Sequence, residues 1–500
     1  MTDSTLGVAL VGLYVTVTLG LGWYGGRRTG ATPREYFLAG GSLGRVVFPL
    51  SLFATLMSAF IFLGSAGFGY VHGLAWAAVI GVEAVAVVPL AYVGLRAWRA
   101  ASAEGYVTPT ELLGDAFDSD RVKLLVVAVQ FGWAVPYVAI QAVGGGLLIE
   151  TVSGGTLSFT VGAAVTMATT AAYLGLGGLR GVAWSDVLQG VTVVVVLVAA
   201  AVYVLPAARA ADVAGALRTS DLLTPAGAAG FFTPRVWLSF LLMNAMAIIA
   251  YPQMFQRFFA AEDERAFRAL LGWWPLMATV AAVLPVVLGL VGTQLLPGLS
   301  TPDLVVPELL ATTAPAWVVG LVVGGAVAAM MSTADSLVLT LSSMVTRDLY
   351  RDHLAGDSDA DGTAAWATEL RVSRASTAAL LGGGFLLALV ATGRAPGVAA
   401  VGTIVELAVY FIQGNALLLP TFLAALYWPA ATRTGAVASV LLGQGYFLAG
   451  VFGPAPAFGF TPFVPALALA VVGLVVGSLL DGAAAARSAP GTGAETRGGD

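Results

Sequence analysis

The chain has 500 residues, of which 58% are hydrophobic and only 10% charged, and its mean hydropathy is +0.89. Soluble proteins are about 45–50% apolar and about 25% charged, so this composition predicts a polytopic membrane protein. The absence of cysteine excludes disulfides, thiolate catalysis and cysteine-ligated metals. The net charge of −5 offers no basic patch for nucleic acid, and no GxxxxGK[ST] loop or HExxH pair is present. We therefore expect neither an ATP-driven pump nor an enzyme.

Apolar segments long enough to cross a membrane recur along the whole chain. A hydrocarbon core of about 30 Å requires about 20 residues per helix. Thirteen segments meet this length, at 6–26, 46–70, 74–95, 123–150, 157–176, 184–206, 236–256, 270–296, 315–346, 373–393, 398–427, 434–452 and 462–481. The first has no cleavage site after it, so we interpret it as a retained span. We expect one transmembrane domain over 1–481 and a disordered tail at 482–500, rich in Ala and Gly.

The distribution of Lys and Arg predicts the orientation. With the N-terminus outside, nineteen of these residues, Arg257 among them, lie in inner loops and four in outer loops. Cytoplasmic loops carry the excess of positive charge, so the pattern predicts a plasma-membrane protein with an external N-terminus and a cytoplasmic C-terminus. The acidic balance, with one lysine, is typical of prokaryotes and especially of salt-loving ones, although a high genomic GC content has the same effect.

Two of the predicted spans contain breaks in their helical pattern. The span at 46–70 is crowded with small and polar residues, and the span at 236–256 contains Tyr251-Pro252. Proline removes one helical hydrogen bond. The two spans are five apart and cross the membrane in opposite senses, which is typical of inverted-repeat transporters whose binding site lies at the breaks. Helix packing is the alternative explanation, since small residues also serve close contacts between membrane helices.

A pair of adjacent hydroxyls, Ser332 and Thr333, lies deep in the span at 315–346. Such hydroxyls often bond back to a carbonyl of their own helix. Beside a span with unwound carbonyls, they can instead supply oxygens to a hard cation. Neutral oxygen ligands suit Na⁺, which must leave its site easily for transport to cycle.

In several stretches the chain resembles the sodium:solute symporter family. The similarity extends from about Tyr36 to about Trp428 and rests on the order and spacing of its motifs. These are Tyr36–Gly44, Ala54–Ser58 with Phe62–Gly64, Gly177–Gln189, Pro252 with Arg257-Phe258, and Ala329–Ser336 through Asp348–Tyr350. Proline-transporting relatives carry an acidic residue where this chain has Leu56, which weakens the case for proline as the solute.

The resemblance implies an all-α fold with two five-helix inverted repeats, at about 46–206 and 236–427, with one helix before the core and two after it. It also implies that Na⁺ is the coupling ion. The implied ligands are the main-chain carbonyls and side-chain hydroxyls of Ala54, Met57, Ala329, Ser332 and Thr333.

Candidate solute contacts follow from positions that match the family beside the breaks: Phe60, Ile61, Tyr137, Gln141, Asn244 and Tyr251. An amide at Asn244 offers both a donor and an acceptor, which favours a polar or anionic solute. The alternative is that Asn244 bonds a neighbouring helix.

Four carboxylates are candidates for coupling or gating: Glu83, Asp186, Asp335 and Glu406. Membrane-embedded acids are costly and often functional. Asp186 matches an acidic position of the family, although a carboxylate at a helix start is the alternative. The others either carry protons or bond across helices. No strong cation is expected at membrane depth to pair with them.

These observations predict Na⁺-coupled symport of a small organic solute, such as a carboxylate, amino acid, vitamin or sugar, by alternating access. The expected partners are the solute and the lipid bilayer, with no obligatory protein partner. One alternative is a proton-coupled symporter that uses Glu83 or Asp335. The other is a transporter-like membrane sensor, for which the tail is too short to hold a signalling domain.

Overall fold

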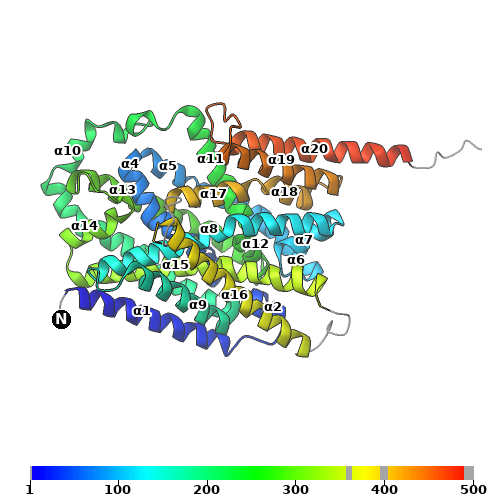
Figure 1. The fold of residues 1–500 in the computed structure, drawn as a ribbon, viewed down its shortest axis with the longest axis horizontal. Coiled ribbons are helices and arrows are strands. Elements are labelled where there is room, and N and C mark those ends of the chain that lie inside the picture. The colour runs from blue at the N-terminus through cyan, green and yellow to red at the C-terminus, as the bar shows by residue number, and fades with distance from the viewer. Residues whose placement is uncertain (1–2, 356–362, 395–403, 489–500) are drawn as a thin grey trace, which may run out of the picture.

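The computed structural model describes residues 3–355, 363–394 and 404–488. Within these ranges the regular secondary structure is helical, as predicted. Among the described residues, ten helices are long and apolar enough to cross a membrane, or up to twelve if each of two bent pairs is one span. In Figure 1, α1 (Asp3–Gly26) lies along one edge beside α9 (Phe159–Ala210), and α19 (Arg433–Phe452) packs on α20 (Phe463–Ser488) at the opposite side.

The helix α9 has 52 residues, which at 1.5 Å per residue is about 78 Å and far longer than one bilayer crossing. Gly178 interrupts it with φ 53° and ψ −157°. A Cβ at this position would lie 2.5 Å from the carbonyl oxygen of Tyr36, so both the space and the backbone angles require glycine. The predicted spans at 157–176 and 184–206 lie on either side of this kink, while the total of thirteen spans stays a prediction.

Both predicted helix breaks are present. The first separates α3 (Val47–Leu56) from the π-helix η2 (Phe60–Gly64) and α4 (Ser65–His72), and the two parts meet at 60°. The second separates α11 (Pro234–Ala250) from α12 (Pro252–Phe259) at 42°. Met57 and Tyr251 are extended at the two breaks, and Pro252 starts α12, where its missing N–H costs nothing.

The two halves of the core follow the same order of elements, as expected for a five-plus-five repeat. After its broken helix, the first half continues with α5 (Ala75–Gly81) and α6 (Glu83–Glu104), the short α7 (Pro109–Phe117), α8 (Asp120–Val152) and α9. The second half continues with α13 (Glu264–Leu295), the short α14 (Val305–Thr313), α15 (Ala316–Met344), α16 (Thr363–Ala391), α17 (Ile404–Ala416) and α18 (Leu419–Tyr427). The short helices α7 and α14 thus hold equivalent places.

The remaining elements are short connections: α2 (Pro33–Leu38), η1 (Ala39–Gly41), α10 (Val213–Arg218), η3 (Asp221–Leu223), η4 (Ala228–Gly230), η5 (Pro302–Leu304) and η6 (Val345–Arg351). The last helix, α20, continues to Ser488, beyond the predicted boundary at 481. Residues 489–500 lie outside the described residues, so the disordered tail stays a prediction.

Candidate ion and solute site

The hydroxyl pair on α15 meets the end of α3. The Ser332 hydroxyl oxygen lies 2.8 Å from the carbonyl oxygen of Ala54 and 2.9 Å from that of Ala329. The Thr333 hydroxyl oxygen lies 2.8 Å from the carbonyl oxygen of Met57 and 3.0 Å from that of Thr55. The structure therefore brings together all five residues that were predicted as cation ligands. It also adds the Thr55 carbonyl.

This cluster contains more oxygens than protons. Each hydroxyl carries one proton, yet each lies within hydrogen-bond distance of two carbonyls. For each of the two hydroxyls, the single proton can therefore serve only one carbonyl. The other hydroxyl–carbonyl contact brings two oxygens together without a proton between them. Ser332 and Thr333 are fully buried, so water from bulk solvent does not satisfy them. Such a set of neutral oxygens fits a small hard cation.

Gln141 holds the α3 break open. In a continuous helix the Ala59 N–H would donate to the Thr55 carbonyl four residues earlier. Here it donates to Oε1 of Gln141 at 2.9 Å, and the Gln141 amide donates to the carbonyl of Tyr137 at 3.1 Å. Both ends of the Gln141 side chain are thus engaged by protein. Its place beside the break was predicted, and its contacts are those of a residue that positions the carbonyls.

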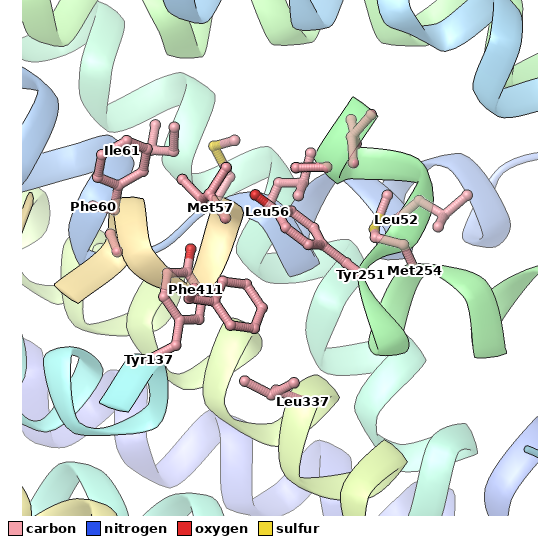
Figure 2. Packing of buried hydrophobic residues seen from close by; sticks show 14 of the residues in the cluster. Leu52, Leu56, Met57, Phe60, Ile61, Tyr137, Tyr251, Met254, Leu337 and Phe411 are labelled. Atoms are coloured by element: carbon pink, nitrogen blue, oxygen red, sulfur yellow. The ribbon is translucent and has the colours of Figure 1, made fainter. Parts of the chain in front are cut away.

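Three aromatic rings gather beside the break (Figure 2). Phe411 on α17 stacks on Tyr137 with centroids 4.0 Å apart and on Tyr251 with centroids 5.0 Å apart. The Tyr137 hydroxyl donates to the hydroxyl of Ser58 at 3.1 Å. Tyr137 and Tyr251 were predicted solute contacts. Phe411 was not, because one phenylalanine in an apolar span carries no local signal.

The other predicted solute contacts also lie in the core. Phe60 packs edge-on against Trp76 at 6.1 Å, and Ile61 beside it is buried. The Asn244 amide donates to the Phe240 carbonyl of its own helix at 3.1 Å, so the alternative of a bond to a neighbouring helix is wrong for this donor. Oδ1 of Asn244 is buried without a hydrogen-bond partner among the described residues, and it is available to a ligand.

A buried arginine lies at the centre of a second polar cluster. Nη2 of Arg257 lies 2.9 Å from the carboxylate of Asp186 and donates to Ser336 at 2.5 Å, and Nε donates to Ser51 at 3.0 Å. The expectation that no strong cation lies at membrane depth is therefore wrong. The reason is the break at Tyr251, after which α12 turns inward and carries Arg257 into the core instead of into a loop.

The candidate acids divide into two groups. Asp186 lies eight residues after the Gly178 kink, so it is in the first turn of neither part of α9, and the helix-start explanation is wrong. Asp335 accepts hydrogen bonds from Tyr173 and, at 2.9 Å, from Ser336. The hydroxyl oxygens of Thr55 and Ser336 lie 3.0 Å apart, and this contact connects Asp186 and Asp335 to the hydroxyl cluster.

Glu83 and Glu406 stand apart from this network. Glu83 is buried at the start of α6, and its backbone carbonyl accepts from the Trp274 indole at 2.9 Å. Glu406 is exposed in the first turn of α17. Of the four candidate acids, only Asp186 and Asp335 therefore lie next to the hydroxyl cluster.

An all-helical membrane core with two inverted halves, each opened by a broken helix, defines the class of secondary transporters that work by alternating access. The family model described as "Sodium:solute symporter family" matches residues 36–443, and the chain belongs to this family. It is therefore a transporter that couples sodium to the symport of a small solute, and it is not an enzyme.

Individual relatives agree with this assignment. The chain is 27% identical over 473 residues to a sodium/pantothenate symporter of Escherichia coli (strain K12), covering 93% of this chain and 94% of the relative. A Na⁺-coupled sialic acid symporter, solved in a substrate-bound outward-open state, shares the fold with a TM-score of 0.78 at 18% identity, over 95% of this chain and 98% of that one. MhsT in complex with L-phenylalanine has a TM-score of 0.55 at 17% identity, over 87% of this chain and 98% of that one.

Proposed function

We propose that the sodium ion binds between α3 and α15, at the carbonyls of Ala54, Met57 and Ala329 and the hydroxyls of Ser332 and Thr333. The observation that carries this proposal is the oxygen cluster with too few protons. Hard cations prefer oxygen ligands, and carbonyl oxygens can replace a hydration shell. A site without a carboxylate binds the ion weakly enough for release into the cell.

The position of this site explains coupling. The ion joins carbonyls of the broken helix to hydroxyls of an unbroken helix, so it stabilises the arrangement in which α3 and α15 touch. A ligand shifts a conformational equilibrium only by its different affinity for the two states. Loss of sodium on the cytoplasmic side then permits the two helices to separate. Inward movement of one charge contributes about 2.3 kcal/mol per 100 mV.

The solute belongs beside the three stacked rings. Phe411, Tyr137 and Tyr251 offer apolar faces, and Oδ1 of Asn244 offers an unpaired acceptor. We propose pantothenate or a closely similar organic acid with hydroxyl and amide groups, whose O–H or N–H can donate to the unpaired Oδ1 of Asn244. The similarity to the sodium/pantothenate symporter supports this choice, and sodium in the neighbouring cluster balances the negative charge of the solute.

Uptake into proteoliposomes tests both proposals. Labelled pantothenate should accumulate under an inward sodium gradient and not when choline replaces sodium. Uptake that follows a pH gradient and ignores this replacement would instead select the proton-coupled alternative. Ser332→Ala combined with Thr333→Val should abolish the sodium dependence. Ser342→Ala is the matched control, because that hydroxyl donates to Leu339 of its own helix and accepts from Ser373 on α16, without contact to the ion ligands. Unchanged sodium-driven uptake in the double variant would refute the assigned ion site.

We further infer that the protein lies in the plasma membrane with its N-terminus outside and its C-terminus in the cytoplasm. The nineteen-to-four distribution of Lys and Arg supports this orientation. The chain contains no cysteine, so a cysteine introduced at Thr5 or Ser488 is the only reactive thiol. A membrane-impermeant maleimide should label the first on intact cells and the second only after lysis. The reverse pattern would contradict the inference.

A further inference from the structure

An apolar groove of about 370 Å³ opens on the outer surface between α3, α9 and α13. Its walls are formed by Leu50, Gly190, Val194, Val195, Trp273 and Leu276, among others. Val195, Trp273 and Leu276 are 58%, 55% and 68% exposed, respectively. In a chain that spans the membrane, such a face contacts hydrocarbon instead of water.

Cations lie at one end of this groove. Arg45 directly precedes Val46, which lines the groove, and Arg265 lies in the first turn of α13, about two turns before Trp273. Both arginines are exposed, and neither forms an ion pair within the described parts of the chain. Three carboxylates lie nearby: Glu262 beside Gly44, Asp263, which caps α13, and Glu264, which pairs with Arg99. Arg268, exposed one turn after Arg265, adds a third cation without an ion pair among the described residues. Three such cations therefore face two carboxylates without an ion-pair partner, so the positive charge is only partly balanced.

We propose that this groove holds an acyl chain of an anionic phospholipid whose phosphate contacts Arg45 and Arg265. An acyl chain gains little by moving from the bilayer into an apolar groove, because lipid tails are as apolar as the groove itself. Selection must therefore come from the headgroup. Each arginine at an anionic membrane surface contributes about a fivefold preference.

The groove also touches the back of the proposed ion site. A Cβ on Gly190 would lie 3.4 Å from the Leu50 carbonyl and 3.6 Å from Cβ of Ala54. The proposed lipid site thus lies at the interface between α9 and α3, the helix that carries the Ala54 carbonyl. A lipid held there contacts three helices at once and stabilises the arrangement in which they lie together.

Tryptophan quenching by brominated lipids tests the proposal. The full chain is placed in phosphatidylcholine nanodiscs that contain either dibrominated phosphatidylglycerol or dibrominated phosphatidylcholine. Subtracting the signal of Trp273→Phe isolates the quenching at the groove. We expect the anionic lipid to quench at a lower mole fraction than the zwitterionic one. Arg45→Gln with Arg265→Gln should reduce this preference about fivefold per arginine removed.

Two further sets of variants test whether the quenching of Trp273 depends on the groove itself and on the arginines beside it. Val195→Phe should fill the groove and prevent quenching of Trp273 by both lipids, whereas Val198→Phe, one turn further along the same exposed face, should not. Removal of the exposed Arg371 and Arg433, which are assigned to the same membrane side, should leave the preference unchanged.

Three results would overturn the proposal. Equal quenching of the wild type by both lipids would mean ordinary boundary lipid. An unchanged preference in the Arg45 and Arg265 double variant would remove the headgroup contact. Protection of Trp273 from both lipids, increasing with protein density, would identify a second copy of the chain as the occupant.

Discussion

The hydroxyl of Thr333 lies 3.0 Å from the main-chain carbonyl of Thr55, 278 positions away in the chain. This contact exists because the N–H that would normally occupy the Thr55 carbonyl, that of Ala59, donates to Gln141 instead. A side chain on α8 thus determines which oxygens of α3 face α15. The ion site depends on three helices, although only two of them supply its proposed ligands.

Gln141→Leu tests this dependence. Without its acceptor, the Ala59 N–H is either left unsatisfied, at a cost of about 1–3 kcal/mol, or returns to the Thr55 carbonyl and closes the break. Either result should lower the sodium affinity at least about tenfold, as for other residues that orient ion ligands. Sodium-dependent thermal stabilisation of the purified protein measures this change. Gln130→Leu is the matched control, since Gln130 is buried on the same helix without a partner among the described residues. A sodium response equally strong in both variants would contradict the positioning role of Gln141.

The effects of substituting Arg257 and Asp186 on the stability of the protein should be strongly coupled. The exposed fractions of the two side chains are 2% and 0%. Arg257→Met alone or Asp186→Leu alone leaves a buried charge without its partner, which costs about 3–5 kcal/mol. The double variant should lose much less than the sum, as measured by a thermal or denaturant double-mutant cycle. In the exposed pair of Arg99 and Glu264, the same cycle should yield about 0–1 kcal/mol. Additive effects at Arg257 and Asp186 would show that the pair contributes no net interaction.

Phe411→Ala should weaken solute binding without abolishing the sodium response. The substitution removes the ring that stacks on both Tyr137 and Tyr251, and each such aromatic pair contributes about 0.5–1.5 kcal/mol beyond its buried area. Solute-induced and sodium-induced thermal shifts are measured separately. Phe447→Ala provides the comparison, because this phenylalanine is equally buried but packs beside Trp133. If both variants lose stability but bind solute alike, the rings have only a structural role.

Asp303 should make the stability depend on pH. Its carboxylate packs against Gly67 of the broken helix in a loop outside the spans, and burial raises the pKa of Asp303 from 3.8 to about 6. Between about pH 4 and pH 6 the folded state holds a proton that the unfolded state has released, so stability should fall as the pH rises through this window. Asp303→Asn should remove this part of the pH dependence of the melting temperature. The exposed Asp118→Asn should leave it intact, and a wild-type-like slope in Asp303→Asn would assign it to another group.

The sequence by itself determined the membrane class, the family and both helix breaks, and it singled out the five residues that we propose as sodium ligands. These features are encoded locally: hydropathy fixes the spans, Pro252 interrupts a helix by its missing N–H, and adjacent hydroxyls remain adjacent in any helix. The positions of Ala54 and Met57 as donors came from family motifs. They too lie in a short contiguous stretch.

Only the tertiary structure decided which distant groups meet. Arg257 was assigned to a loop because charge and sequence position favour that reading, yet the bend at Tyr251 turns α12 inward toward Asp186. Phe411 and Gln141 acquire their roles through contacts with segments far away in the chain. Local pattern cannot reveal such pairings, because the direction of a helix after a break is set by packing against neighbours and not by the residues at the break.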